Sequence, residues 1–224
     1  MLRALELIMD KIFVLEKLEK KRELDPDCIG FGVERHCYKL QPPIEESRLV
    51  ALEEKYGIVL PEDYRKFILT IGNGGAGPSY GLYSIEGALT GKADKIYKYP
   101  GSEVGDDIKK PFVRPDEVGE EDEEYPDYKG MLILCQHGCA NDDYIIVNGS
   151  ESGFVWEFIE WVGHHIPLLK NMPDLTYINE LPQKERPDAE KKWIRTLLSV
   201  KREEKMTFTD WYLDWLEKPP HILP

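Results

Sequence analysis

The chain has 224 residues and a formal net charge of −13, and 42% of its residues are hydrophobic. This length and composition allow a sizeable apolar core, while no run of about 18 apolar residues is present that could span a bilayer. The first residues lack the apolar run and cleavage site of a signal peptide. The negative charge disfavours direct binding to nucleic acid and favours a basic protein partner. We therefore expect a globular, cytoplasmic protein.

The N-terminal part is expected to be helical. Apolar residues at near-helical spacing predict an amphipathic helix over residues 2–20, with a stripe formed by Leu5, Ile8, Ile12, Leu15 and Leu18. Residues 25–43 contain several Pro and Gly and predict a connection with one short strand and a candidate domain boundary. Residues 44–56 predict a second helix, which Gly57 ends as a C-terminal cap.

The stretch from Leu60 to Gly77 organises the chain. Pro61 suits the first position of a helix, and four apolar residues then recur at i, i+3, i+4 and i+7, namely Tyr64, Phe67, Ile68 and Ile71. The sequence Asn73-Gly74-Gly75 can adopt left-handed backbone angles, so it ends the helix in a sharp turn. The stretch therefore predicts a helix that packs one face on a core.

Strands and further helices are predicted downstream. Residues 80–85 predict a short strand, and residues 131–135, 144–148 and 153–156 predict an antiparallel meander. Residues 131–135 are apolar at every position, so we expect a central strand buried on both faces. Helices are expected over residues 158–170, 188–205 and 208–216. The last carries an aromatic stripe, and Thr209 is its candidate N-cap.

Residues 116–127 hold eight acidic residues and no Lys or Arg, which predicts a solvated insertion. One arrangement of charged residues is similar to that of metal-dependent nucleases, in which acids hold Mg²⁺ and a lysine helps to activate water. It consists of Asp116, Asp127 and Lys129. Such acids need packed strands to hold them, and this segment has few apolar residues. We therefore prefer a charged loop and keep the nuclease as the enzyme alternative.

Cysteine and histidine residues offer one further candidate site. Cys135, His137 and Cys139 alternate, and His164 and His165 lie downstream, so a zinc site of thiolate and imidazole is conceivable. The spacing is not a standard one, and a free cysteine commonly behaves as a small hydrophobe. We therefore expect a buried strand cysteine followed by a turn, with no metal and no cofactor.

Several short motifs together resemble the SUKH superfamily, which includes bacterial immunity proteins and the fungal Smi/Knr cell-wall regulators. The resemblance lies in the order and spacing of Leu60-Pro61 with Tyr64 and Phe67, Asn73-Gly74-Gly75, Gly130 to Leu134, Gly138, Tyr144 to Gly149 and Gly153 to Trp156. It implies an α+β fold with a central, mostly antiparallel sheet flanked by helices. We expect a single domain over residues 1–224, with a core at about 44–165, a closing helix at 208–217 and helical additions at both ends.

The resemblance also implies a non-catalytic protein-binding function. The first interpretation is an immunity protein that neutralises a toxin partner, for example a basic nuclease, through an acidic surface. The alternative is a regulatory scaffold of the cell-wall-regulator type. Candidate partner-binding residues are Glu121, Asp122, Glu123, Glu124, Asp142 and Asp143. The last two are also interpreted as residues of a hairpin turn.

Overall fold

The computed structural model describes residues 10–91, 104–117, 128–160, 163–174 and 176–222. Its helices and strands are α1 (Lys11–Leu24), α2 (Glu46–Tyr56), α3 (Glu62–Thr70), α4 (Ile85–Thr90), β1 (Met131–Gly138), β2 (Asn141–Ile146), β3 (Val155–Ile159), β4 (His164–Pro167), α5 (Thr176–Glu180), α6 (Arg186–Leu198) and α7 (Phe208–Glu217). Among the described helices, none is long and apolar enough to cross a membrane.

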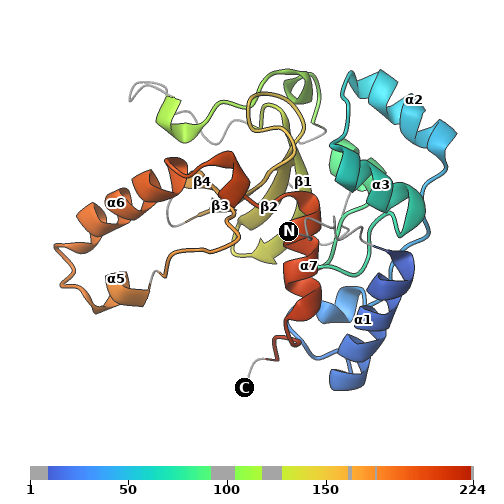
Figure 1. Ribbon diagram of the computed structural model, residues 1–224, viewed down its shortest axis with the longest axis horizontal. Helices are drawn as coiled ribbons and strands as arrows, with labels where there is room; N and C mark the ends of the chain where they lie inside the picture. The colour runs from blue at the N-terminus through green and yellow to red at the C-terminus, as the bar shows by residue number, and fades with distance from the viewer. Residues whose placement is uncertain (1–9, 92–103, 118–127, 161–162, 175, 223–224) are drawn as a thin grey trace, which may run out of the picture.

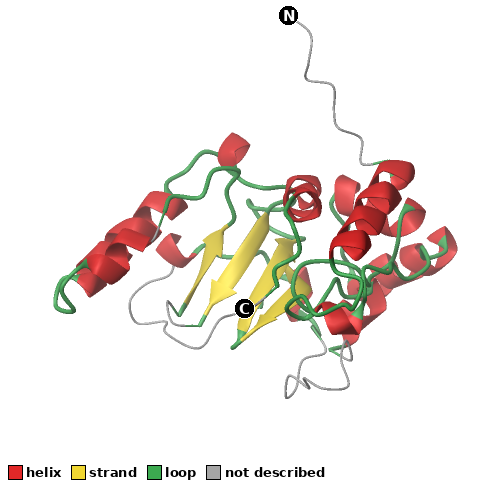
Figure 2. Ribbon diagram, turned by 90° about the horizontal axis from the view of Figure 1, so that it is seen from below, coloured by secondary structure: helices red, strands yellow, loops and turns green. Residues whose placement is uncertain are grey.

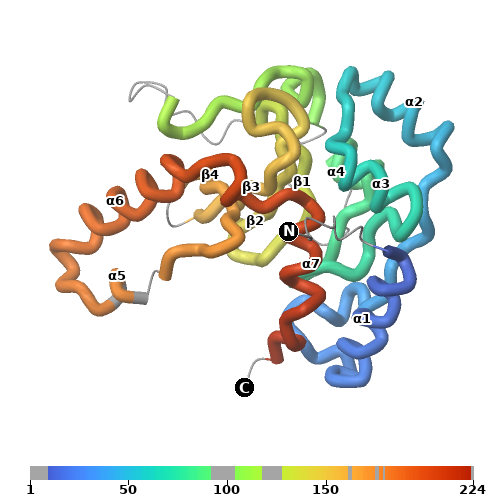
Figure 3. The backbone as a smooth tube through the Cα atoms, viewed as in Figure 1, coloured from blue at the N-terminus to red at the C-terminus, as the bar shows by residue number. Residues whose placement is uncertain are grey.

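The four strands form an antiparallel sheet in the order β1-β2-β3-β4. Helices α1, α2 and α3 lie on the β1 side of this sheet, whereas α5 and α6 lie on the β4 side (Figures 1 and 2). The tube in Figure 3 shows that α7 returns from the β4 side to pass between the sheet and α1. The predicted α+β fold, its antiparallel meander and its helical additions at both ends are therefore confirmed.

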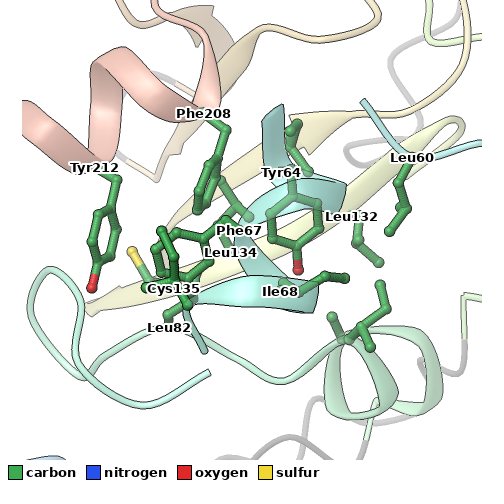
Figure 4. Packing of buried hydrophobic residues seen from close by; sticks show 14 of the residues in the cluster. Leu60, Tyr64, Phe67, Ile68, Leu82, Leu132, Leu134, Cys135, Phe208 and Tyr212 are labelled. Carbon is green, nitrogen blue, oxygen red and sulfur yellow. The ribbon is translucent and has the colours of Figure 1, made fainter. Parts of the chain in front are cut away.

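The main core forms where α3 and α7 pack on the sheet, above β1 (Figure 4). The ring of Phe208 lies 4.8 Å from the ring of Tyr64 and 5.0 Å from that of Phe67, measured between centroids. Tyr212 completes the group, with its ring 4.7 Å from Phe67 and its hydroxyl donating to the carbonyl of Ala76 (2.9 Å). Because aromatic side chains bury large areas, this contact supplies much of the apolar burial. The predicted stripe on α3 is confirmed.

The start of α7 differs from the prediction. Its N-cap is Thr207 and not Thr209: the Thr207 hydroxyl accepts from the Asp210 N–H (3.2 Å), and the Asp210 carboxylate accepts from the Thr207 N–H (3.1 Å). This reciprocal capping box satisfies two N–H groups that a helix start leaves unpaired. Thr209 instead donates its N–H to Asp63 on α3 (2.9 Å), so it ties the two helices together at their N-terminal ends.

The turn after α3 is the predicted one. Gly75 has φ +97°, and a Cβ there would lie 2.4 Å from the carbonyl oxygen of Lys39, so only glycine fits. The side chain of Asn73 accepts from the Ile85 N–H and donates to Glu86, both at 2.9 Å. The turn therefore fixes the start of α4.

Two predicted strand positions are wrong. Residues 80–85 form no strand but run along the free edge of β1, where Tyr83 donates its N–H to the carbonyl of Leu134 (2.9 Å), and Ser84 then caps α4. The prediction of β1 as a central strand is also wrong, because β1 is the first strand of the sheet. It is apolar because helices cover one face, a second apolar cluster covers the other, and residues 80–83 shield its edge.

Two predicted helices are also placed differently. In α1, Ile12 and Leu15 are 66% and 47% exposed, and the buried side chains are Val14, Leu18 and Lys21. Leu5 and Ile8 of the expected stripe lie outside the described residues. The helix predicted over residues 158–170 is replaced by the end of β3 and by β4, because these residues add a fourth strand to the sheet.

The buried His165 on β4 predicts a specific acid sensitivity. Its ring lies against the rings of Phe158 and Tyr144, 5.2 and 5.7 Å away, and its buried Nε2 atom has no hydrogen-bond partner in the part of the chain that the structure describes. Asp142 shares this face of the sheet, and His164 is adjacent in sequence. Burial lowers the pKa of His165 from 6.5 to about 3.

In the unfolded chain His165 takes up a proton near its ordinary pKa of 6.5, whereas the folded protein resists that proton. The stability contributed by neutral His165 is complete above pH 6.5 and is lost as the pH falls below that value, by about 2 kcal/mol at about pH 5. We expect His165→Phe to remove this part of the pH dependence of the unfolding free energy in urea titrations. The exposed His221→Gln is the control, and an unchanged pH dependence in His165→Phe would contradict the assignment.

Candidate functional site

The β1–β2 hairpin brings three reactive side-chain types together. Its loop consists of Cys139 and Ala140, whose φ angles of 51° and 56° suit a two-residue turn that follows the twist of the strands. Register shifts interrupt the pairing between Ile133 and Cys135 and again between Gln136 and Gly138. Such irregularities redirect side chains at functional positions, and here Cys135 is turned into the core beneath α7.

A polar row crosses the sheet at this level. Cys135 on β1 is directly opposite Asp143 on β2, which is opposite Glu157 on β3. His137 follows Cys135 by two residues along β1. Residues directly opposite each other in an antiparallel sheet project to the same face. The side chains of Cys135, Asp143 and Glu157 therefore share one face of the sheet. Trp211 of α7 lies over this row and donates its indole N–H to Asp143 Oδ2 (2.8 Å).

The three donor atoms of Cys135, His137 and Asp143 lie within 4.8 Å of one another. His137 Nε2 is 2.8 Å from Asp143 Oδ2, and Cys135 Sγ is 3.5 Å from His137 Nε2 and 3.6 Å from Asp143 Oδ2. The other ring nitrogen of His137, Nδ1, is 2.8 Å from the hydroxyl of Ser79. The imidazole is therefore held at both nitrogens.

The electrostatics of this cluster follow from its burial. Burial raises the pKa of the Cys135 thiol to about 12. Burial disfavours the imidazolium form of His137, but the Asp143 carboxylate favours it more strongly, so the pKa of His137 is raised above its ordinary value. Burial and the Asp143 charge together raise the pKa of Glu157 to about 7. The cluster thus holds a neutral thiol beside an imidazolium–carboxylate pair.

A Cys–His–Asp set can form a nucleophilic triad, but this geometry does not support one. The nucleophile of such a triad is a thiolate that substrate can reach. Cys135 is fully buried, and its raised pKa keeps it protonated. His137 directs Nε2 at the carboxylate as well as at the sulfur, so it is positioned as an ion-pair partner. The arrangement instead suits a structural role, in which Asp143 joins the hairpin to α7 through its ion pair with His137 and its hydrogen bond from Trp211.

The structure assembles this cluster differently from the sequence pattern. Cys135 and His137 come together as considered for zinc, but Cys139 is exposed in the turn and is not part of the described donor cluster. His164 and His165 lie on β4, at the far edge of the sheet. The third member is Asp143, which sequence reasoning missed as a possible ligand. The two-residue loop alone would place Cys135 opposite Tyr144. Asp143 comes opposite Cys135 only through the register shift between Gln136 and Gly138, which no sequence signal indicated.

The two acids predicted in a turn or at a partner surface lie inside the sheet. Asp142 and Asp143 belong to β2, and the turn is at Cys139 and Ala140, so their interpretation as turn residues is wrong. Both are buried, with exposures of 2% and 3%. Asp142 accepts from the hydroxyl of Tyr144 (3.1 Å), and Asp143 binds Trp211 and His137. Both carboxylates are therefore turned into the protein and are not exposed on its surface.

The other predicted site residues flank or occupy the acidic segment. Asp116 lies in a single turn of 3₁₀ helix and is bound by Arg114 through two hydrogen bonds of 3.0 and 2.9 Å. Lys129 precedes β1. The acids from Glu121 to Glu124, together with Asp127 of the nuclease alternative, lie outside the described residues. Arg114 already occupies the Asp116 carboxylate that a metal would need.

Comparison with known proteins identifies the family to which this chain belongs. The family model of the SMI1 / KNR4 family (SUKH-1) matches residues 43–176. No curated protein and no solved structure gives a significant match. Since the match covers more than half of the chain and includes α2, α3 and the whole sheet, the chain belongs to the SMI1/KNR4 (SUKH-1) family. This membership supports an immunity or regulatory domain that is in general non-catalytic.

The contrast between Cys135 and Cys139 predicts their reactivity. Because only the thiolate reacts with alkylating reagents, buried and protonated Cys135 should react at least about tenfold more slowly than exposed Cys139 at mildly alkaline pH. Peptide mapping after timed exposure to iodoacetamide measures both rates, and the same experiment in denaturant provides the control in which they converge. Faster labelling of Cys135 than of Cys139 in the folded protein would show an activated thiol and contradict the non-catalytic interpretation.

Proposed function

We propose that this chain is a non-catalytic protein-binding domain, an immunity protein that neutralises a toxin partner through its acidic segment, residues 116–127. The proposal is supported by the density of acids in that segment, eight in twelve residues, within the span that matches the family. The net charge of −13 extends the same attraction to the whole molecule. A partner of complementary chemistry is a basic domain, such as a nuclease that binds phosphate backbones.

The two ends of the acidic segment are held against the sheet. On the N-terminal side, Arg114 binds Glu151 (3.3 Å), and Phe112 packs its ring 4.9 Å from that of Trp156. On the C-terminal side, the ring of Tyr128 lies 5.9 Å from the ring of Tyr144 on β2. The segment therefore departs from and returns to the face of the sheet opposite α7. The described ends of the segment therefore adjoin a structured surface that a partner could also contact.

The carboxylates of the acidic segment would raise the rate of association with a basic partner and help to select that partner over others. A basic partner approaching an acidic segment associates faster at low salt. At about 0.1 M salt the attraction between charges more than about 10 Å apart is largely screened. Asp142 and Asp143 are buried in the sheet, so the proposed contact depends on Glu121, Asp122, Glu123 and Glu124. We also propose a location in the cytoplasm, where such an inhibitor would meet an incoming toxin.

The test compares two variants with the same change of charge. In the first, Glu121, Asp122, Glu123 and Glu124 are replaced by Gln or Asn; in the second, the same is done to four exposed acids near α1, Glu16, Glu19, Glu23 and Asp27. Each variant changes the net charge by four, from −13 to −9. Immobilised proteins are exposed to lysate of the source cells at low and high ionic strength, and captured proteins are identified by mass spectrometry.

We expect the wild-type protein and the α1 variant to capture the same basic partner at low salt only. The segment variant should lose about 8- to 30-fold in affinity, since four charges at about 0.3–0.5 kcal/mol each amount to roughly 1.2–2.0 kcal/mol. Equal capture by both variants would contradict the segment as the interface. Hydrolysis of DNA or RNA with Mg²⁺ that is lost in Asp127→Ala would contradict the non-catalytic assignment. A cell-wall regulatory protein as the captured partner would favour the scaffold alternative.

A further inference from the structure

We propose that Cys135, His137 and Asp143 form a binding site for Zn²⁺ or a similar divalent transition metal at the junction of the β1–β2 hairpin with α7. Thiolate, imidazole and carboxylate are the three side-chain types that bind Zn²⁺ in proteins. The proposal is independent of the partner-binding function, because the site lies on the sheet face covered by α7 and the acidic segment returns to the opposite face.

The geometry is close to that of three corners of a tetrahedron. Bonds of about 2.0–2.3 Å from Zn²⁺ to oxygen, nitrogen and sulfur place donor atoms about 3.3–3.6 Å apart. The observed separations from Cys135 Sγ, 3.5 Å to His137 Nε2 and 3.6 Å to Asp143 Oδ2, match this range. The His137–Asp143 separation of 2.8 Å is that of a hydrogen-bonded ion pair and must widen by about 0.5 Å when the metal replaces the shared proton.

A second observation points to a ligand at this position. Oδ1 of Asp143 is buried and has no hydrogen-bond partner among the described residues, although Oδ2 accepts from Trp211 and His137. A buried carboxylate oxygen without a donor is costly. Coordination of the metal by both carboxylate oxygens, Oδ2 at the distances above and Oδ1 beside it, is one way to satisfy it. The side chain of Asp143 is only 4% exposed, whereas that of His137 is 26% exposed, so an ion can enter past the imidazole.

The surroundings hold the donors as metal sites commonly do. The Ser79 hydroxyl lies 2.8 Å from Nδ1 of His137. In the neutral tautomer that carries its proton on Nδ1, the hydroxyl accepts from this N–H, and the Nε2 lone pair is directed toward Cys135 and Asp143. Trp211 orients the carboxylate from α7. Such outer contacts fix the tautomer and the orientation of the ligands. Three protein ligands leave a fourth position for water.

Charge and proton balance are also favourable. Zn²⁺ bound by one thiolate, one carboxylate and one neutral imidazole forms an electrically neutral centre, which suits a buried position. Binding removes the thiol proton of Cys135 and the Nε2 proton of His137, so two protons are released for each ion bound. The ion therefore replaces an ion pair by a coordinated centre that links β1, β2 and, through Trp211, α7.

The experiment is a Co²⁺ titration of the full chain, prepared without a polyhistidine tag, stripped with a chelator and reduced with a phosphine. We expect one Co²⁺ per chain, with the near-ultraviolet charge-transfer band of a thiolate-bound ion and the intense visible bands of tetrahedral Co²⁺. Zn²⁺ should displace the bound Co²⁺ and so abolish both sets of bands. When either ion is added to the stripped protein in a weakly buffered indicator solution, two protons should be released per ion bound.

Matched variants assign the ligands. Cys135→Ser should abolish the charge-transfer band, whereas Cys139→Ser, altered at the exposed thiol nearby, should retain it. Ser79→Ala should weaken Co²⁺ binding by about 10–100-fold with the spectrum preserved, because it removes only the outer contact to His137. Failure of the wild-type chain to develop the band would overturn the proposal, as would a band that persists in Cys135→Ser or disappears in Cys139→Ser. Weak, octahedral Co²⁺ spectra would mean surface binding only and would overturn it as well.

Discussion

The packing of α7 across α3 and β1 is the contact on which the rest of the structure depends. Phe208 fills the space between Tyr64 and Phe67, and Tyr212 closes the same group while its hydroxyl binds the turn at Ala76. A helix near the C-terminus therefore completes the core of a span that lies more than thirty residues before it. Its start is joined to α3 through Asp63, so the orientation of the two helices is fixed by polar as well as apolar contacts.

The same helix determines the electrostatics of the hairpin. Trp211 covers the buried Asp143 and donates to it, and this contact excludes water from a carboxylate that also binds His137. A buried charge is tolerated only when it is paired and hydrogen-bonded, so hairpin and helix stabilise each other. The opposite face of the sheet has a different role, because it anchors both ends of the acidic segment. The packing of α7 and the proposed binding of a partner thus involve opposite faces of the same sheet.

Periodicity predicted the parts of the fold that bury a regular apolar face. The stripe of α3 and the aromatic stripe of α7 follow the helical repeat directly, and the meander follows from short apolar runs between turns. β4 was missed because a four-residue strand is too short to show a repeat. The face of α1 was misassigned because Lys21 is buried, with its amine donating to the carbonyl of Lys218, and a pattern rule counts lysine as exposed. Asp143 could not be recognised because its environment depends on register and on a helix distant in sequence.

The most direct test of this account is the unfolding of a chain shortened to residues 1–206, which keeps the whole family-matched span and lacks α7. We predict that this chain loses the near-ultraviolet circular dichroism of its packed aromatic residues and shows no cooperative thermal transition, because α3, β1 and Asp143 all lose their cover. A cooperative transition within a few degrees of that of the full chain would show that the matched span folds by itself, and would contradict the central role of α7.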